Sequence, residues 1–337
     1  MITPPPLRND CFALPPGVNW TPVDAALTLL KDRLGPVTAS EDLPLQEAVG
    51  RVLAANVIAL RSNPPQANSA VDGYGFAGPI PEGPHVMPLV EGRAAAGVPY
   101  EGMVPAGQAI RILTGAAIPD GVDTVILEED VNTADGKIAF NGPLKQGANA
   151  RKAGEDVIAG AVALTAGRVL TPADLALVSA VGVDRVHLRK RLRVAVVSTG
   201  DELVEPGAEA RPGQIYDANR PMLLALMRQW GFAALDLGPT GDDRAQLRAQ
   251  LDRGAAAADV ILTSGGASAG DEDHLAALLN QTGAMSLWRI AIKPGRPLAL
   301  GLWNGTPIFG LPGNPVAAMV CTLVFARPAM GLLAGQG

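Results

Sequence analysis

Three short apolar segments, each running directly into a glycine-containing loop, constrain the fold of this chain more than any other feature. They are VAVVSTGDE (194–202), VILTSGGASAGDED (260–273) and PIFGLPGNPV (307–316). Because helical patterns alternate with these segments, we predict strands of a mostly parallel sheet, whose carboxyl ends share one edge. Open α/β sheets bind ligands at that edge. We therefore expect the three loops to meet around one ligand site.

The loops carry groups that suit both anions and cations. Glycine lets backbone N–H groups approach an anion, and a following helix N-terminus favours negative charge. A fourth segment, IKPGRPLALG (292–301), adds Lys293 and Arg296, two cations that suit oxyanions. Carboxylates suited to a hard cation follow two of the strands, namely Asp201, Glu202, Asp271 and Asp273. The sequence thus predicts a site for a phosphate-like ligand together with a divalent metal.

Length and composition limit the class of protein. A chain of 337 residues indicates two or three domains. A net charge of −6 argues against nucleic-acid binding, which usually needs a basic face. Cys11 and Cys321 form no CxxC motif, so we expect a reducing compartment and neither a disulfide framework nor a structural zinc site.

No segment is expected to enter a membrane. The N-terminal residues MITPPPLRNDCFALPPG contain prolines and lack the apolar core of a signal peptide. The longest apolar run, PVAAMVCTLVFA (315–326), is too short to span a bilayer, and we predict a buried helix there. We expect a soluble, cytoplasmic protein.

Changes in composition along the chain predict three domains. Thr21-Pro22-Val23-Asp24 and Thr171-Pro172-Ala173-Asp174 are both typical of a helix N-terminus, with Thr as the N-cap. Between them, residues 63–154 are dense in Gly and Pro with short apolar runs, which favours a small all-β unit. The predicted domains are a discontinuous helical domain I (20–62 and 155–190), an inserted β domain II (63–154) and an α/β domain III (191–330).

We expect a multidomain α/β fold. In its α/β part, two pairs of adjacent acids could each supply a ligand-binding carboxylate. We predict helices at 219–229 and at 242–253, the latter ended by Gly254, and a final helix that begins at Asn314-Pro315. Asp242 and Asp243 both suit an N-cap, so the sequence does not decide which of them reaches a ligand. Asp201 and Glu202 likewise remain alternatives, because neighbouring loop residues can point apart.

Together these segments resemble the molybdopterin molybdenumtransferase family, which includes the MoeA-like enzymes and the E domain of gephyrin. The resemblance covers residues 20–330, and its motifs occur in the order and spacing of the family. They are NSAVDGYGF (68–76), RILTGA (111–116), GEDV (154–157), STGDELVEPG (198–207), GQIYDANR (213–220), TSGGASAGDEDH (263–274), IAIKPGRPLALG (290–301) and GLPGNPV (310–316).

The resemblance implies an enzyme that inserts molybdate into adenylylated molybdopterin, with Mg²⁺-dependent release of AMP and formation of molybdenum cofactor. It implies an elongated homodimer, in which the β domain of one subunit faces the α/β domain of the other, and a possible partner in the molybdopterin adenylyltransferase. Mg²⁺ prefers carboxylates and phosphate oxygens, which agrees with the acidic loops.

Functional residues are carried over from the family motifs position by position. The resemblance implies catalytic roles for Asp72, Glu202, Asp273 and Lys293. It implies metal ligands among Asp201, Glu202, Asp242 and Asp273. The implied substrate-binding residues are Thr114, Asp156, Gly265, Gly266, Ser268, Arg289, Arg296, Pro312, Gly313 and Asn314.

Two departures from the family pattern keep alternative functions open. Ala317 stands where the family has a serine after Gly-Asn-Pro-Val, which removes a hydroxyl donor near the expected molybdate site. Family members usually continue into a C-terminal β-barrel domain IV, which we expect to be absent here. The alternatives are a catalytically impaired molybdopterin-binding or scaffold homologue, and a molybdopterin adenylyltransferase.

Overall fold

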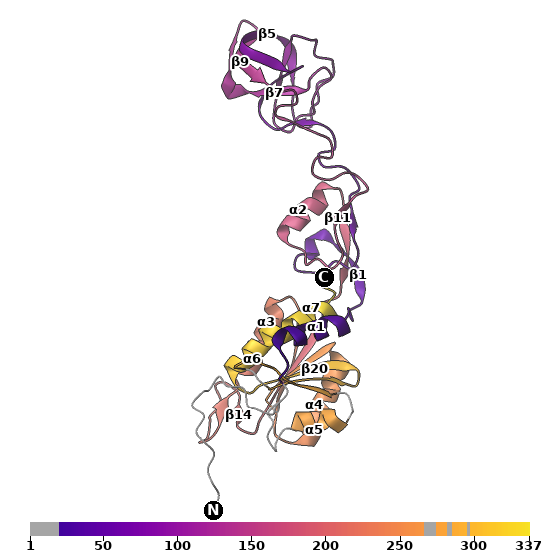
Figure 1. Cartoon of the computed structure of the whole chain (residues 1–337), viewed down its shortest axis with the longest axis vertical. Coiled ribbons are helices and arrows are strands. Elements are labelled where there is room, and N and C mark those ends of the chain that lie inside the picture. Colours follow the sequence, from indigo (N-terminus) through magenta and orange to yellow (C-terminus); the bar gives the residue numbers. More distant parts are fainter. Residues whose placement is uncertain (1–19, 266–273, 282–284, 295–296) are drawn as a thin grey trace, which may run out of the picture.

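The computed structural model describes residues 20–265, 274–281, 285–294 and 297–337. Three regions follow one another along an elongated molecule (Figure 1). An α/β unit lies at one end, a small unit around helix α2 (Pro172–Ala180) lies in the middle, and a β unit lies at the far end. The predicted α/β multidomain fold is confirmed.

The α/β unit is built on a six-stranded sheet with the strand order β16-β13-β17-β20-β19-β18. The strands are β13 (Arg193–Thr199), β16 (Ala233–Thr240), β17 (Val260–Ser264), β18 (Met285–Arg289), β19 (Pro297–Trp303) and β20 (Thr306–Leu311). Neighbours from β16 to β20 pair in parallel, whereas β19 is antiparallel to both β20 and β18. Strand β18 therefore runs in the same direction as β20, and its carboxyl end lies at the shared edge.

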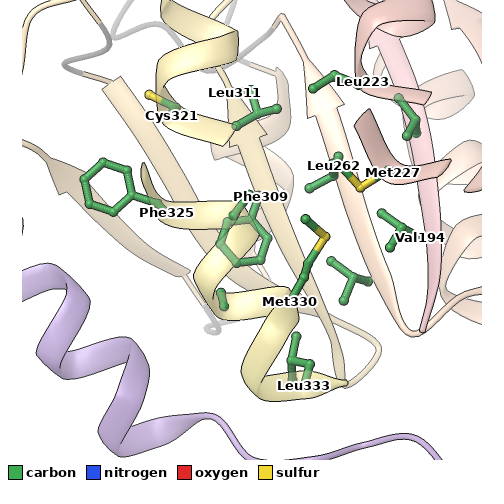
Figure 2. Close-up of a cluster of buried hydrophobic side chains, with 14 of the residues drawn as sticks. Val194, Leu223, Met227, Leu262, Phe309, Leu311, Cys321, Phe325, Met330 and Leu333 are labelled. Carbon is green, nitrogen blue, oxygen red and sulfur yellow. The ribbon is translucent and has the colours of Figure 1, made fainter. Parts of the chain in front are cut away.

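Successive side chains of each strand point to opposite faces of the sheet, and both faces are apolar. On one face, Val194 and Val196 of β13 pack with helices α1 (Val23–Arg33), α3 (Asn219–Gln229), α6 (Pro315–Cys321) and α7 (Arg327–Leu333). On the other face, Ala195 and Val197 pack with α4 (Arg244–Ala257) and α5 (His274–Gln281). Figure 2 shows the first cluster, where Phe309 and Leu311 of β20 lie between the last helices and β17. A strand with both faces covered is apolar throughout, as the parallel-sheet prediction requires.

The apolar run near the C-terminus is part of a longer helical segment than predicted. Helix α6, the π-helical turn η3 (Thr322–Ala326) and α7 together cover Pro315–Leu333, which is 19 residues with a mean hydropathy of 1.8. The prediction that this run is too short to span a bilayer is therefore wrong on length. The predicted buried helix is confirmed, because Phe325, Met330 and Leu333 pack on the sheet (Figure 2). Because this helical segment covers one face of the sheet, its residues are mostly apolar.

Two predicted helix boundaries are wrong. Helix α4 begins after Asp243 and continues to Ala257, so Gly254 does not end it. A Cβ on Gly254 would lie 3.1 Å from Leu237 and 3.2 Å from Ile261, so glycine allows the helix to pass close to the sheet. Thr21 does not cap α1, whose N-cap is Pro22 without a side-chain hydrogen bond. The Thr21 backbone instead bridges to Ile290 beside β18.

An outgoing and a returning stretch of chain pair with each other in the middle of the molecule. The pairs are β1 (Ser40–Pro44) with β12 (Arg185–Arg189), β2 (Val57–Ile58) with β11 (Val162–Leu164), and β3 (Asn68–Ser69) with β10 (Ala150–Arg151). A core that includes Leu53, Leu170 and Val178 joins this ribbon to η1 (Leu45–Glu47) and α2. This pairing agrees with a β unit inserted between the two stretches. The boundaries drawn for domains I–III remain a prediction, and α1 packs with the α/β unit.

The β unit at the far end is a six-stranded sheet with the order β7-β4-β6-β5-β9-β8. Its strands are β4 (Gly73–Phe76), β5 (Ile80–Ala94), β6 (Ala109–Ile112), β7 (Thr124–Leu127), β8 (Val131–Ala134) and β9 (Lys137–Leu144), with η2 (Glu128–Asp130) after β7. Phe76 stacks on Phe140 at 5.3 Å between ring centroids. At Gly73, a Cβ would overlap the backbone of Ile126, so β4 accepts only glycine at this crossing with β7.

Candidate functional site

The carboxyl edge of the α/β sheet forms a pocket. The loops after β13, β17 and β20 line it, together with β15 (Ile215–Tyr216) and the start of α3. Its volume is about 580 Å³, including the space open to solvent. The lining residues are Thr199, Glu202, Leu203, Ile215, Tyr216, Asp217, Ala218, Asn219, Ser264, Gly265, Gly313 and Pro315. The three glycine loops thus meet at one place, as the sequence predicts.

Asn219 ties two of these loops together. Its Nδ2 donates hydrogen bonds to Ser264 Oγ at 2.6 Å and to the Gly313 carbonyl oxygen at 2.7 Å. The Asn219 side chain is 7% exposed, and its Oδ1 is buried without a hydrogen-bond partner among the described residues. A buried amide with this geometry holds the ends of β17 and β20 at a defined separation.

A buried ionic network supports the pocket from below. Asp217 is 2% exposed, accepts a short hydrogen bond from Ser198 and accepts another from Arg220 Nε at 3.0 Å. Arg220 also donates to Asp236 at 2.7 Å and pairs with Glu205, which lies after β14 (Leu203–Val204). Because Asp217 and Asn219 are two residues apart, this network positions the amide of Asn219.

Acidic side chains gather beside the pocket. Asp201 Oδ1 accepts the Asp242 N–H at 3.0 Å, and Asp242 Oδ2 accepts the Asp201 N–H at 3.2 Å. Asp243 instead caps α4 through the Gln246 N–H at 2.8 Å, which separates the roles of the two adjacent acids. The Glu202 carboxylate lies against Gly200, where a Cβ would overlap it, and Glu202 lines the pocket.

Asp201 and Asp242 could supply part of the ligand set of a hydrated divalent cation. Each carboxylate uses one oxygen for a backbone N–H and keeps the other, which matches the one or two carboxylates that Mg²⁺ usually takes from a protein. Among the residues that the structure describes, no three His, Cys, Asp or Glu side chains gather as a metal site. Asp273, the fourth predicted metal ligand, lies outside the described residues.

The other predicted residues of this edge divide into three groups. Gly265 and Gly313 line the pocket, Pro312 precedes Gly313, and Asn314 caps α6 by accepting the Ala317 N–H at 3.1 Å. Lys293 is exposed on the connection from β18 to β19, and Arg289 ends β18, so both belong to the same edge of the sheet. The predicted residues Gly266, Ser268, Asp271 and Arg296 lie outside the described residues.

A second polar cluster lies at the base of the β unit. Asp72 Oδ1 accepts the Thr114 N–H at 2.6 Å and the Thr114 hydroxyl at 2.9 Å. These two hydrogen bonds, followed by the charge of Arg111, lower the pKa of Asp72 from its usual value. Arg111 pairs with Glu128, donates to the Gly73 carbonyl oxygen at 3.1 Å, and lies over the Tyr74 ring. Asp72 is therefore an exposed, oriented and ionised carboxylate.

Asp156 belongs to the returning stretch of chain, between β10 and β11. It accepts hydrogen bonds from Arg151 at 2.7 Å and from Asn63 Nδ2 at 3.1 Å. The two predicted residues of the β unit, Asp72 and Thr114, are thus brought together, and Asp156 is held by the ribbon. In one chain, the β unit and the pocket-bearing α/β unit lie at opposite ends of the molecule (Figure 1).

Sequence reasoning missed the residues that hold the pocket in shape. Asp217, Asn219 and Arg220 occur in the motif GQIYDANR, but none of them was predicted as a site residue. The sequence offered one signal for these residues, namely the polar pair Asp217 and Asn219 at the start of an amphipathic helix. That signal is weak, because Asp and Asn at this position usually act only as caps.

Comparisons with known proteins match nearly the whole chain. Residues 21–182 match the family model described as the MoeA N-terminal region (domain I and II), and residues 195–331 match a probable molybdopterin binding domain. The molybdopterin molybdenumtransferase of Haemophilus influenzae is 39% identical over 93% of this chain and 78% of its own length. Molybdopterin molybdenumtransferase 2 of Mycobacterium tuberculosis is 38% identical over 87% of this chain and 75% of its own length.

Solved structures give the same result. A crystal structure of the molybdopterin biosynthesis moeA protein from Pyrococcus horikoshii matches with a TM-score of 0.77 and 29% identity, and covers 95% of this chain and 80% of its own. A second crystal structure of that protein matches with a TM-score of 0.72 and 31% identity, over 95% of this chain and 81% of its own.

Proposed function

Because the chain belongs to the molybdopterin molybdenumtransferase family, we propose that it inserts molybdate into adenylylated molybdopterin and releases AMP. The observation that carries this proposal is the pocket at the carboxyl edge, where three glycine loops meet hydroxyl and amide groups beside an acidic pair. Glycine loops at this edge suit the phosphates of a nucleotide-linked substrate. Lys293, at the same edge, adds positive charge that attracts the molybdate dianion.

Asp201 and Asp242 would hold Mg²⁺, and Glu202 and Asp273 remain proposed ligands. When bound, Mg²⁺ supplies positive charge that offsets the charge of the phosphates. The chain itself binds and orients the substrate. Buried Ser264 and half-exposed Tyr216 both line the pocket.

Asp72 takes part as a carboxylate. Its lowered pKa keeps it ionised at neutral pH, so it can accept a proton or a hydrogen bond but cannot act as an acid. Thr114 fixes the direction of one oxygen through two hydrogen bonds and leaves the other toward solvent. We propose that this carboxylate and Asp156 face the substrate.

The separation of the two clusters supports a site that is shared with a second subunit. We propose that the chain forms a homodimer, in which Asp72 and Thr114 of one subunit face the pocket of the α/β unit of its partner. The opposite placement of the two units in one chain supports this arrangement (Figure 1). We also propose that the enzyme acts in the cytoplasm and receives its substrate from the molybdopterin adenylyltransferase.

One observation favours the alternative of an impaired binding or scaffold homologue. Ala317 is buried at the start of α6, beside the pocket residue Pro315, and carries no hydroxyl. The adenylyltransferase alternative lacks such support, because residues 21–182 match a region that we expect only in the transferase.

AMP release tests the proposal. The purified chain is incubated with adenylylated molybdopterin and Mg²⁺, with and without molybdate, and AMP is measured. We expect AMP release that increases with molybdate and falls strongly in Asp72→Asn, whereas Glu129→Gln, an exposed acid in the same β unit, behaves as wild type. Tight substrate binding without AMP release would support the scaffold alternative, and absence of binding would contradict the proposed site.

A further inference from the structure

The hydrogen bonds of Asn219 determine what the neighbouring Ser264 can do. Asn219 Nδ2 donates to Ser264 Oγ and to the Gly313 carbonyl oxygen, and the second bond fixes which end of the amide carries the protons. Ser264 Oγ therefore accepts from Asn219. A hydroxyl that accepts one hydrogen bond still has its own proton to donate.

The Ser264 proton has no acceptor within the described part of the chain. The Ser264 side chain is 2% exposed and lines the pocket, and the hydrogen bonds of its hydroxyl include only the one from Asn219. A buried hydroxyl proton without an acceptor is costly, and such a group commonly faces a ligand. The pocket is the open space next to this hydroxyl.

We propose that Asn219 is a positioning residue that keeps the Ser264 hydroxyl as a hydrogen-bond donor to a phosphoryl oxygen of the nucleotide part of the substrate. This inference rests on the proposed function, which supplies the nucleotide. Gly265 and Gly313 flank Ser264 and carry no side chain that would keep a phosphate away. Hydroxyl donors bind anionic oxygens more strongly than neutral ones.

Replacement of Asn219 by aspartate reverses the hydrogen bond. A carboxylate only accepts hydrogen bonds, so the Ser264 hydroxyl donates to the new carboxylate at position 219. Its proton is then no longer available to the ligand. Asn219→Asp should then weaken nucleotide binding as much as Ser264→Ala does.

The test measures the binding of AMP with Mg²⁺ by calorimetry for the full chain and its variants. We expect about ten-fold weaker binding for Ser264→Ala and for Asn219→Asp, and about the same loss, not the product, for the double variant. Near-wild-type affinity is expected for Gln229→Ala, an exposed amide at the other end of α3. Circular dichroism checks that each variant is folded.

Each remaining outcome overturns the inference. Losses that multiply in the double variant would show that Asn219 acts independently of Ser264. Wild-type affinity in Ser264→Ala would remove the proposed donor, even if Asn219→Asp does not fold. Failure of the wild-type chain to bind AMP would overturn both this inference and the proposed nucleotide site, which separates it from a failure seen only in the variants.

Discussion

Arg220 joins four segments of the α/β unit through one guanidinium group. It contacts Asp217 at the start of α3, Asp236 in β16 and Glu205 after β14, and Asp217 in turn accepts from Ser198 in β13. Burial on its own would lower the pKa of Arg220, but the hydrogen bonds that Arg220 donates to Asp236 and Asp217 outweigh burial and raise it. The positive charge of Arg220 is therefore permanent.

Loss of one partner should be costly at this position. Asp217→Asn leaves part of a buried cation without its charge partner, so we expect the free energy of unfolding to fall by about 3 kcal/mol. Arg193→Ala breaks a more exposed pair with Asp259 and should cost less than about 1 kcal/mol. Urea unfolding of both variants measures the difference. Equal effects would contradict a structural role for the network.

The ionised state of Asp72 predicts a pH profile. Because its pKa lies below the usual 3.8, the carboxylate stays charged throughout the range from about pH 5 to 8. Asp72→Asn should lower molybdate-dependent AMP release by the same factor at every pH in that range. A ratio of wild-type to variant rate that falls toward one below about pH 6 would show that Asp72 titrates there.

At the scale of elements, two nearly identical helix starts have different structures. Thr171 and Asp174 form a complete capping box at the start of α2. Thr21, in the same Thr-Pro-X-Asp pattern, caps nothing, because its carbonyl oxygen accepts the Ala291 N–H at 2.9 Å and its backbone follows β18. A tertiary contact decides between them, and no local pattern reveals it.

This contrast gives a matched pair of variants. Thr171→Ala should lower the free energy of unfolding by about 1 kcal/mol, because the Asp174 N–H loses its partner. Thr21→Ala should change it by less than about 0.5 kcal/mol. Chemical denaturation measures both. Similar losses would contradict the capping difference.

Asp174 also makes the stability of this element depend on pH. Burial alone would raise the pKa of Asp174, but the hydrogen bonds from Arg168 and Thr171 outweigh burial and lower it. A lowered folded-state pKa contributes stability above the unfolded value of 3.8, and this stability is lost as the pH falls through the folded value. The stability difference between wild type and Asp174→Asn should therefore shrink below about pH 4.

Most elements of the α/β unit could be predicted from sequence, because apolar strands and capped helices leave local patterns. Helix α3 has the predicted bounds, and α6 begins after the predicted Asn314 cap. The position of Gly254 inside α4 was not predictable, because only close packing on Leu237 and Ile261 explains it. The convergence of the glycine loops followed from parallel topology, whereas the clamp made by Asn219 depends on atoms brought together by the fold.

At the scale of the whole molecule, two polar clusters occupy different ends of one chain. Sequence motifs indicate both clusters, but motifs carry no information on their separation. The paired ribbon of β1 to β3 with β10 to β12 carries the β unit away from the α/β unit (Figure 1). In the proposed dimer, each site combines residues of two copies of the chain. Light scattering should therefore give about twice the chain mass of 34.6 kDa.

The most direct measurement uses a dimer with two differently altered subunits. Asp72→Asn and Glu202→Gln chains carry different tags, are coexpressed, and are purified on both tags in turn. If each site combines the β unit of one subunit with the pocket of its partner, one site of the two is intact, and AMP release should reach about half of the wild-type rate. Each altered homodimer should keep only a small fraction of the wild-type rate. An inactive mixed dimer would contradict a site shared between subunits.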